Sequence, residues 1–156
     1  NLEEDPKIVA LKQKLLDELM NQAICMARVS CCERGKHACL LVSRELRVLS
    51  TGYNGPAARL PNHCLRPDSS GAIGRGCGCV HAEVNASIQP RNGTPFYAFC
   101  TAAPCEACAQ VLINVGVRTV VYDRLTESGK AGRQLLLLAG VGCFDFDNFP
   151  VGVLSL

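Results

Sequence analysis

Two short stretches of the chain carry residue types that bind a transition metal. Residues 81–85 read HAEVN and residues 104–108 read PCEAC. Cys105 and Cys108 are three residues apart at the expected start of a helix, so their sulfur atoms share one helix face and can hold one metal ion. A helix N-terminus also stabilises thiolates, the form of cysteine that binds metals. The spacing therefore predicts a metal site with these two cysteines as ligands.

His81 supplies the third ligand that a catalytic zinc site needs. Two thiolates leave zinc short of ligands, and His81 fills a third position while the fourth stays open for water. Zinc lowers the pKa of a bound water to about 7, and Glu83 is placed to take the proton without binding the metal. A Cys-x-x-Cys pair alone also occurs in structural zinc sites and redox motifs. Glu83 favours catalysis, because a structural site has no use for an acid beside an open position.

The order of His-x-Glu and Pro-Cys-x-x-Cys resembles the signature of the zinc-dependent nucleobase deaminases. The resemblance covers about residues 30–146 and is nearest to the deoxycytidylate deaminases, on STGYNG at residues 50–55 and on His63 with Cys64. It implies hydrolytic deamination of a cytosine nucleotide, dCMP to dUMP and ammonia, with Zn²⁺ as cofactor and Glu83 as the proton shuttle. It also implies a homo-oligomer, such as a hexamer, with dCTP and dTTP as effectors.

Substrate contacts are also implied by this resemblance. Asn54 is expected to contact the sugar or base, and the backbone around Ala82 to meet the pyrimidine carbonyl. A phosphate needs donors, and Arg34 is favoured over the other basic residues of the same region, which are Lys36, Arg59, Arg66 and Arg75. The chain departs from the family at residues 37–39, where His-Ala-Cys replaces the usual Val-Gly-Ala, and at Phe99, where relatives often have tyrosine.

A second zinc is the other metal site that the resemblance implies, because some deoxycytidylate deaminases carry a structural zinc near the segment before the HAE motif. Any four of five residues here would complete a closed tetrahedral site: Cys31, His63, Cys64, Cys77 and Cys79. Such a metal would keep a glycine-rich segment ordered. The alternative is that these cysteines are ordinary core or surface residues. The cysteines at 25, 39, 100 and 143 are expected to be small core residues.

Other functions share these zinc residues. The substrate could be dCTP or cytosine in a single-stranded polynucleotide, riboflavin-pathway and tRNA adenosine deaminases have similar motifs, and a zinc-stabilised binding module is the non-enzymatic alternative. A formal net charge of only +2 does not indicate a nucleic-acid partner. Aromatic residues are 5% of the chain and tryptophan is absent, which weakens the polynucleotide interpretation. We therefore expect a small nucleotide as the ligand.

The elements that must position these residues alternate between helices and strands. An amphipathic helix is expected at 6–27, with Asp5 as its cap and Pro6 as its first residue, followed by a strand hairpin at 38–43 and 48–53. After an irregular segment at 54–79, helices are expected at 80–89, 105–115 and 130–139, and strands at 96–100, 118–122 and 141–146. The alternation predicts a three-layer α/β/α fold of the cytidine deaminase type, with a five-stranded mixed sheet whose last strands are parallel.

Length and composition are consistent with one domain over residues 1–156. The hydrophobic fraction of 48% suffices for one core. Eleven cysteines, an odd number, with no secretory signal disfavour a disulfide framework. No stretch approaches the roughly 18 apolar residues of a membrane span. These features predict a cytoplasmic protein without a membrane partner. The run Leu135–Leu138 exceeds what one helix face needs, and either fills the core or contacts a neighbour.

Overall fold

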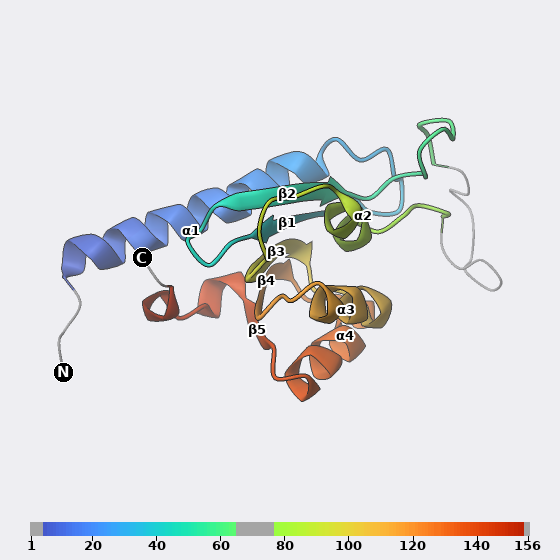
Figure 1. The fold of residues 1–156 in the computed structure, drawn as a ribbon. Helices are drawn as coiled ribbons and strands as arrows, with labels where there is room; N and C mark the ends of the chain where they lie inside the picture. Colours follow the sequence, from blue (N-terminus) through green and yellow to red (C-terminus); the bar gives the residue numbers. More distant parts are fainter. Residues whose placement is uncertain (1–4, 65–76, 155–156) are drawn as a thin grey trace.

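A five-stranded mixed sheet forms the centre of the molecule in the computed structural model, which describes residues 5–64 and 77–154 (Figure 1). Its strands are β1 (Ala38–Val42), β2 (Val48–Tyr53), β3 (Tyr97–Ala102), β4 (Thr119–Arg124) and β5 (Gly142–Asp145), in the order β2-β1-β3-β4-β5. β1 pairs antiparallel with β2 and β3, whereas β3, β4 and β5 are parallel. The predicted mixed sheet with parallel last strands is confirmed.

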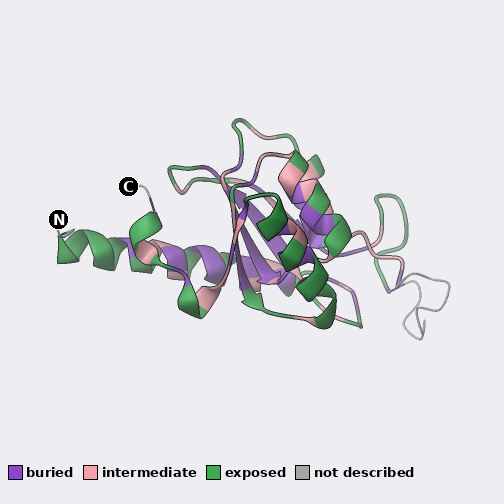
Figure 2. Ribbon diagram, turned by 90° about the horizontal axis from the view of Figure 1, so that it is seen from below, coloured by how far each residue is buried: buried purple, intermediate pink, exposed green. Residues whose placement is uncertain are grey.

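Helices cover both faces of this sheet. α1 (Pro6–Ala27) packs on one face with the short 3-10 turns η1 (Phe146–Asn148) and η2 (Val151–Val153) near it, and α2 (Ala82–Ile88), α3 (Glu106–Asn114) and α4 (Glu127–Leu138) cover the other (Figure 1). Figure 2 shows the buried sheet between the helices, whose outward faces are exposed. The predicted three-layer α/β/α arrangement is therefore confirmed.

Strand β1 is buried along its whole length because it faces both helical layers. Leu40 and Val42 belong to the core against α1, while Cys39 and Leu41 belong to the core against α2, α3 and α4. Successive side chains of a strand point to opposite faces, so each layer receives every second residue. The buried strand segments thus hold the two helical layers in fixed positions relative to each other.

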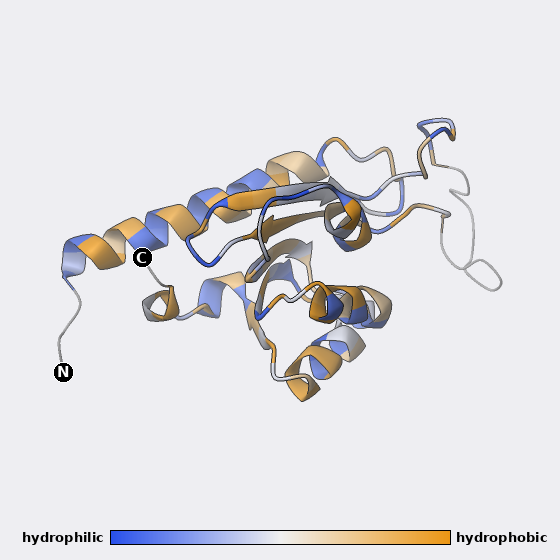
Figure 3. Ribbon diagram, in the orientation of Figure 1, coloured by the Kyte–Doolittle hydropathy of each residue, from blue (hydrophilic) through white to orange (hydrophobic). Residues whose placement is uncertain are grey.

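The ends of α1 and α3 follow from local chemistry. Asp5 caps α1, because its side chain accepts a hydrogen bond from the backbone N–H of Lys7 at 2.9 Å, and Pro6 occupies the first helical position. Alternating polar and apolar bands along α1 (Figure 3) bury Leu16, Leu19 and Ala23. Gly116, with a φ of 98°, adopts the left-handed conformation that ends α3. These signals were readable in the sequence.

Helix α4 begins earlier than the sequence indicates, at Glu127 instead of near residue 130. Thr126 caps it by accepting a hydrogen bond from the backbone N–H of Gly129 at 3.2 Å. In its leucine run, Leu136 is fully buried, whereas Leu138 is 85% exposed.

Cys25, predicted to be a core residue, is exposed on α1. Among the described residues, no helix is both long enough and apolar enough to cross a bilayer.

Candidate active site

A cavity of about 330 Å³ opens where the parallel strands end. Ala102 and Ala103 reach it from the end of β3, and Thr126 and Ser128 from the segment that follows β4. The first residues of α2 complete the wall from a third side. In open α/β sheets, ligands bind outside the carboxyl ends of the strands, so the fold places this cavity where a substrate site is expected.

Three metal-binding side chains meet in this region. His81 Nδ1 lies 3.6 Å from Cys105 Sγ and 3.3 Å from Cys108 Sγ. All three donor atoms lie within 4.8 Å of one another, and we call these residues the His-Cys-Cys centre. His81 immediately precedes α2 and Cys105 immediately precedes α3, as N-cap residues. The structure thus brings together the three ligands proposed from the sequence, and one imidazole with two sulfurs suits zinc.

Two close backbone contacts fix the helices that carry this centre. A Cβ atom at Gly52 of β2 would collide with the backbone of Ala82 and Ala86, so β2 and α2 approach without an intervening side chain. A Cβ atom at Gly132 of α4 would collide with the carbonyl oxygen of Pro104. Because α4 packs directly on this turn, Cys105 is held from behind by a helix rather than by a flexible loop.

Electrostatics within the His-Cys-Cys centre favour one thiolate. Hydrogen bonds from Cys108 and His81 lower the pKa of the Cys105 thiol to about 4. The hydrogen bond to Cys105, followed by burial, raises the pKa of Cys108, which keeps its proton as the donor of the pair. A hydrogen bond to Cys105 likewise raises the pKa of His81. The protein itself therefore provides the negative charge that attracts a cation to this position.

Glu83 is buried beside the centre and lines the same cavity. Its relative exposure is only 9%. Burial raises the pKa of its carboxyl group above the ordinary value of 4.5, although its own backbone N–H, the Cys108 thiol and the charge of His81 act in the opposite direction. A carboxyl group whose pKa is shifted toward neutrality can both accept and return a proton at physiological pH. Glu83 lies in the first turn of α2 and is not one of the three metal-binding residues, so its carboxyl group stays available for proton transfer.

The side-chain amide of Asn54, expected to contact a sugar or base, is already engaged in hydrogen bonds. Its Oδ1 accepts from the backbone N–H of His37 and its Nδ2 donates to the carbonyl oxygen of Gly35, both at 2.8 Å. Asn54 is buried and lines the cavity. It therefore fixes the segment before β1, in addition to any contact with a ligand.

The other expected substrate residues divide between two cavities. Ala82 and Arg34 line the cavity beside the His-Cys-Cys centre. Lys36 lines a separate cavity of about 270 Å³, which is bounded by residues of α1 and β4. Arg59 is exposed and lines neither of these cavities. Arg66 and Arg75 lie outside the described residues. Arg34 is thus the proposed phosphate donor that lies at this site.

Further cysteines gather at a second position in the molecule. The sulfur atoms of Cys32, Cys64 and Cys77 lie within 4.8 Å of one another, with Cys32 and Cys77 3.3 Å apart, and Cys79 packs against them. We call these four residues the thiol cluster. Burial opposes ionisation of Cys77, yet hydrogen bonds from the backbone and thiol of Cys79 lower its pKa. Cys77 is thus easier to ionise than an isolated cysteine.

The membership of this cluster differs from the ligand set expected from the sequence. Cys32 takes the place assigned to Cys31, and His63 is exposed and lies outside the group. Ser30 explains the choice, because its hydroxyl donates to the carbonyl of Asn54 at 2.6 Å and accepts from the backbone N–H of Cys32 at 3.1 Å. These bonds hold the backbone at Cys32, which is buried, whereas Cys31 is only partly buried.

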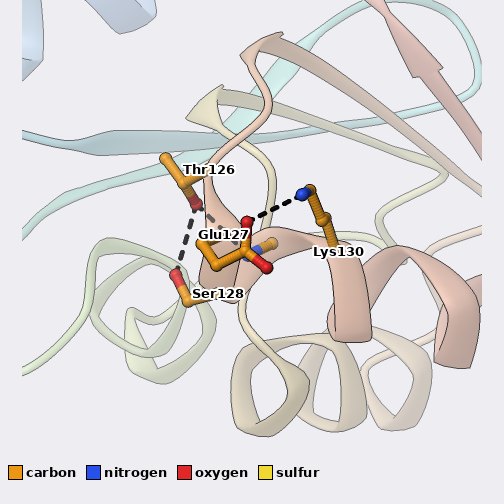
Figure 4. A network of polar contacts seen from close by, with 5 residues as sticks. Thr126, Glu127, Ser128 and Lys130 are labelled. Carbon is orange, nitrogen blue, oxygen red and sulfur yellow. Dashed lines mark hydrogen bonds and ion pairs between the residues drawn. The ribbon is translucent and has the colours of Figure 1, made fainter.

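Sequence reasoning also missed residues that follow β4. Thr126 and Ser128 line the cavity, and their hydroxyl oxygens lie 3.2 Å apart (Figure 4). Beside them, Lys130 forms an ion pair with Glu127 at 2.7 Å. The signal that could have found them is topological: two parallel strands end at the same edge, so the residues after both strands share one cavity. His37 also lines the cavity, although it is not among the site residues expected from the sequence.

Comparisons with known proteins agree with this geometry. Residues 13–124 match the family described as cytidine and deoxycytidylate deaminase zinc-binding region. Deoxycytidylate deaminase of Schizosaccharomyces pombe is 33% identical over 132 residues, covering 78% of this chain but 41% of the yeast protein. That of Mycobacterium phage D29 is 33% identical over 116 residues, covering 65% and 88%. The apo dCMP deaminase structure from cyanophage S-TIM5 superposes with a TM-score of 0.67 and 25% identity, over 91% of this chain and 99% of the phage chain.

Proposed function

Since this chain belongs to the cytidine and deoxycytidylate deaminase family, we propose that it is a zinc-dependent hydrolase that converts dCMP to dUMP and ammonia. The observation that carries the proposal is the buried carboxyl group of Glu83 beside the His-Cys-Cys centre, in one cavity. The chain spans less than half the length of the S. pombe relative. The proposal therefore concerns the chemistry of the region present here.

Zinc fits the donor atoms of the His-Cys-Cys centre. One imidazole nitrogen and two sulfurs lie within 4.8 Å of one another, and two of these residues border the cavity. Three protein ligands with one open side are typical of catalytic zinc, whereas structural zinc has four protein ligands. When bound by His81, Cys105 and Cys108, zinc would lower the pKa of a coordinated water to about 7 and make hydroxide available at neutral pH.

Glu83 moves the protons of the reaction. Its carboxylate takes a proton from the attacking water and passes it to N3 of the cytosine ring as the new C4–O bond forms. Its carboxylate then takes the proton of the new C4 hydroxyl group and delivers it to the amino group on C4, so that the C4–N bond breaks, the C4=O bond forms and ammonia leaves. Water and dCMP thus become dUMP and ammonia without an oxidant or reductant. The raised pKa of Glu83 suits both steps, because the same group must accept and donate.

The cavity supports a small cytosine nucleotide as substrate. Its volume of about 330 Å³ is within the range of small-molecule sites. The backbone N–H of Ala82 lies in the first turn of α2, where N–H groups have no partner within the helix, and this free donor supports its proposed contact with the pyrimidine carbonyl. Arg34 provides the charge for a phosphate. No Phe, Tyr or Trp lines the cavity among the described residues, which disfavours a stacked polynucleotide.

A second zinc in the thiol cluster is also part of the proposal. Four sulfur donors would complete a closed tetrahedral site, and Cys32, Cys64 and Cys77 are all buried. The cluster joins the end of α1 to the segments on both sides of residues 65–76. We infer that this zinc is structural, because four cysteine ligands would fill all four positions of a tetrahedral site and leave none for a water or substrate.

Assembly, regulation and location are proposed from the resemblance alone. We propose a homo-oligomer, such as a hexamer, that responds to dCTP and dTTP and is located in the cytoplasm. Leu137 and Leu138, exposed at the end of α4, provide apolar surface for a neighbouring subunit. Light scattering after size-exclusion chromatography, with and without each triphosphate, tests the assembly and its response.

Substrate profiling tests the proposed reaction directly. The zinc-replete protein is incubated separately with dCMP, dCTP, deoxycytidine and a cytosine-bearing single strand of DNA, and ammonia release is followed. Glu83→Ala is the inactive control, and Glu106→Ala is the matched control, because Glu106 is an exposed acid in the first turn of α3. We expect turnover of dCMP only. Activity confined to dCTP or to the strand would overturn the substrate assignment, and zinc binding without any turnover would favour a binding module.

A further inference from the structure

The separate cavity that Lys36 lines, which we call the second cavity, has no role in the proposed reaction. In β3 and β4, Phe99 and Val121 belong to the core against α1, and Thr101 and Asp123 follow them by two residues. Because every second residue of a strand points to the same face, Thr101 and Asp123 point toward α1. The second cavity thus opens on the α1 face of the sheet. Its volume is about 270 Å³, and its lining residues are Ile24, Ala27, Arg28, Lys36, Thr101, Asp123 and Arg124.

Three basic side chains from three parts of the chain border the second cavity. Arg28 is the C-cap residue of α1, Lys36 lies in the segment before β1, and Arg124 is the last residue of β4. Like charges repel one another at short range, so their convergence on one cavity is unfavourable without a counter-charge. Among the described residues, Asp123 is the one carboxylate in the lining.

Asp123 leaves most of this positive charge without a partner. Its Oδ2 lies 4.0 Å from Nε of Arg124, and both side chains are exposed. Exposed ion pairs at this distance contribute little free energy. Within the part of the chain that the structure describes, the side chains of Arg28 and Lys36 form neither an ion pair nor a hydrogen bond. Their N–H groups are therefore available to a ligand.

The chemistry of the lining selects an oxyanion. Guanidinium and ammonium groups are the side-chain donors that proteins use to bind phosphate. The described lining contains no Phe, Tyr or Trp on which a base could stack. We propose that the second cavity binds the phosphate groups of a small molecule, with Arg28, Lys36 and Arg124 as the donors. This site is additional to the proposed deamination and does not depend on it.

The second cavity and the active-site cavity share a chain segment. Lys36 lies between Gly35 and His37, both of which line the active-site cavity. The side chain of Asn54 holds this segment, because its Oδ1 accepts from the His37 N–H and its Nδ2 donates to the Gly35 carbonyl. A phosphate bound by Lys36 would hold the same segment from the side opposite the substrate.

Isothermal titration calorimetry with pyrophosphate tests the site on the zinc-loaded protein at low ionic strength. We expect Lys36→Gln and Arg28→Gln each to raise the Kd for pyrophosphate by roughly 5- to 20-fold, because each removes a charge-assisted hydrogen bond. Lys14→Gln is the matched control, since Lys14 is an exposed residue of α1 outside the second cavity. It removes the same charge and should change the Kd by less than about 2-fold, because distant exposed charges are screened.

A second variant and a second ligand locate the phosphate and identify its source. Arg34 lines the active-site cavity, so Arg34→Gln should keep the affinity for pyrophosphate if the anion binds in the second cavity. Adenosine diphosphate has two phosphate groups and adds a nucleoside. Its Kd should lie within about 3-fold of that for pyrophosphate, because no aromatic ring is present to stack on a base. Tighter binding of adenosine diphosphate that is weakened by the same two variants would support the site and identify a nucleotide as its ligand.

Three outcomes would overturn the proposal. They are a wild-type protein that does not bind pyrophosphate, equal affinities in Lys36→Gln, Arg28→Gln and Lys14→Gln, and a loss of affinity in Arg34→Gln alone, which would locate the phosphate in the active-site cavity. Zinc content and melting temperature are measured for every variant to detect changes in metal binding or folding. Failure of the proposed deamination would leave these results unchanged, because calorimetry measures binding without turnover.

Discussion

The His-Cys-Cys centre and the thiol cluster both border the cavity, yet they differ in access. In the His-Cys-Cys centre, His81 is exposed and Cys105 is half-buried. In the thiol cluster, Cys32, Cys64 and Cys77 are only 3%, 6% and 8% exposed. Three protein ligands with a carboxyl group beside them suit a catalytic metal, whereas four cysteine ligands suit a structural one.

The two sites also differ in the elements that carry their ligands. The ligands of the His-Cys-Cys centre lie at the starts of α2 and α3, which are held by direct backbone contacts at Gly52 and Gly132. The ligands of the thiol cluster lie in irregular segments after α1 and on both sides of residues 65–76. In the proposed site a metal would order the second region, whereas the first region is ordered by its packing.

Removal of a ligand from the His-Cys-Cys centre should have the largest effect. We expect Cys108→Ser to reduce turnover of dCMP to background and the zinc content from two ions per chain to one, because a catalytic zinc needs all three protein ligands. Elemental analysis and ammonia release measure these two quantities. Loss of both zinc ions would show that the two sites depend on each other, and full activity would contradict the assignment of the centre.

Replacement of Glu83 should separate proton transfer from metal binding. We expect Glu83→Gln to keep both zinc ions and to lower kcat by about 10²–10⁴-fold, the usual contribution of a positioned acid or base. Steady-state kinetics on protein of known zinc content provide the measurement. Glu106→Gln is the control, and substantial activity in Glu83→Gln would exclude Glu83 as the proton shuttle.

A change in the thiol cluster should affect stability more than activity. Cys64 does not line the cavity, so Cys64→Ser should keep turnover at 25 °C within about 3-fold. The loss of a structural metal should destabilise the fold by about 3 kcal/mol, or roughly 6–12 °C in melting temperature for a chain of this length. Cys31→Ser is the matched control, because Cys31 lies outside the cluster. Equal melting temperatures for the two variants would argue against a metal in the cluster.

Much of the fold could be predicted because periodicity and capping residues are local signals. Asp5 and Pro6 mark the first residue of α1, and every expected helix and strand is present within a few residues. The start of α4 could not be predicted as well, since Gly129 and Gly132 have low helix propensity and are explained only by the backbone of residues 103–105 against which they pack.

The residues of the candidate site likewise divide into those that could be predicted from sequence and those that could not. Cys105 and Cys108 could be assigned from sequence because residues three apart share a helix face. His81 and Glu83 could be assigned because the order of the two motifs resembles the deaminase signature. The choice between Cys31 and Cys32 could not be made, because it depends on the hydrogen bonds of Ser30 to Asn54 and to Cys32. Thr126 and Ser128 could be predicted to line the cavity only if the order of the strands in the sheet were known, because their place depends on which strands end at the same edge.

The smallest predicted effect concerns the melting temperature of the metal-free protein when the buried Glu83 is replaced. Because burial raises the pKa of Glu83 above 4.5, the folded protein retains a proton that the unfolded chain releases. The resulting stabilisation is complete below pH 4.5 and is lost as the pH rises through the raised pKa of the folded state. Glutamine mimics the protonated carboxyl group. In metal-free protein, Glu83→Gln should therefore melt at a higher temperature than the wild type at pH 8, on the order of 2–4 °C, with a smaller difference near pH 5.

Thermal unfolding in the presence of a chelator, followed by circular dichroism at several pH values, measures this difference. Glu106→Gln should show no such dependence, because that side chain is exposed. A Glu83→Gln variant whose melting temperature follows that of the wild type at every pH would contradict the raised pKa. If the melting temperature of Glu83→Gln exceeds that of the wild type by an amount that grows with pH, the buried carboxyl group lowers the stability of the fold. A metal in the thiol cluster would have the opposite effect, because it would stabilise the segments that the cluster joins.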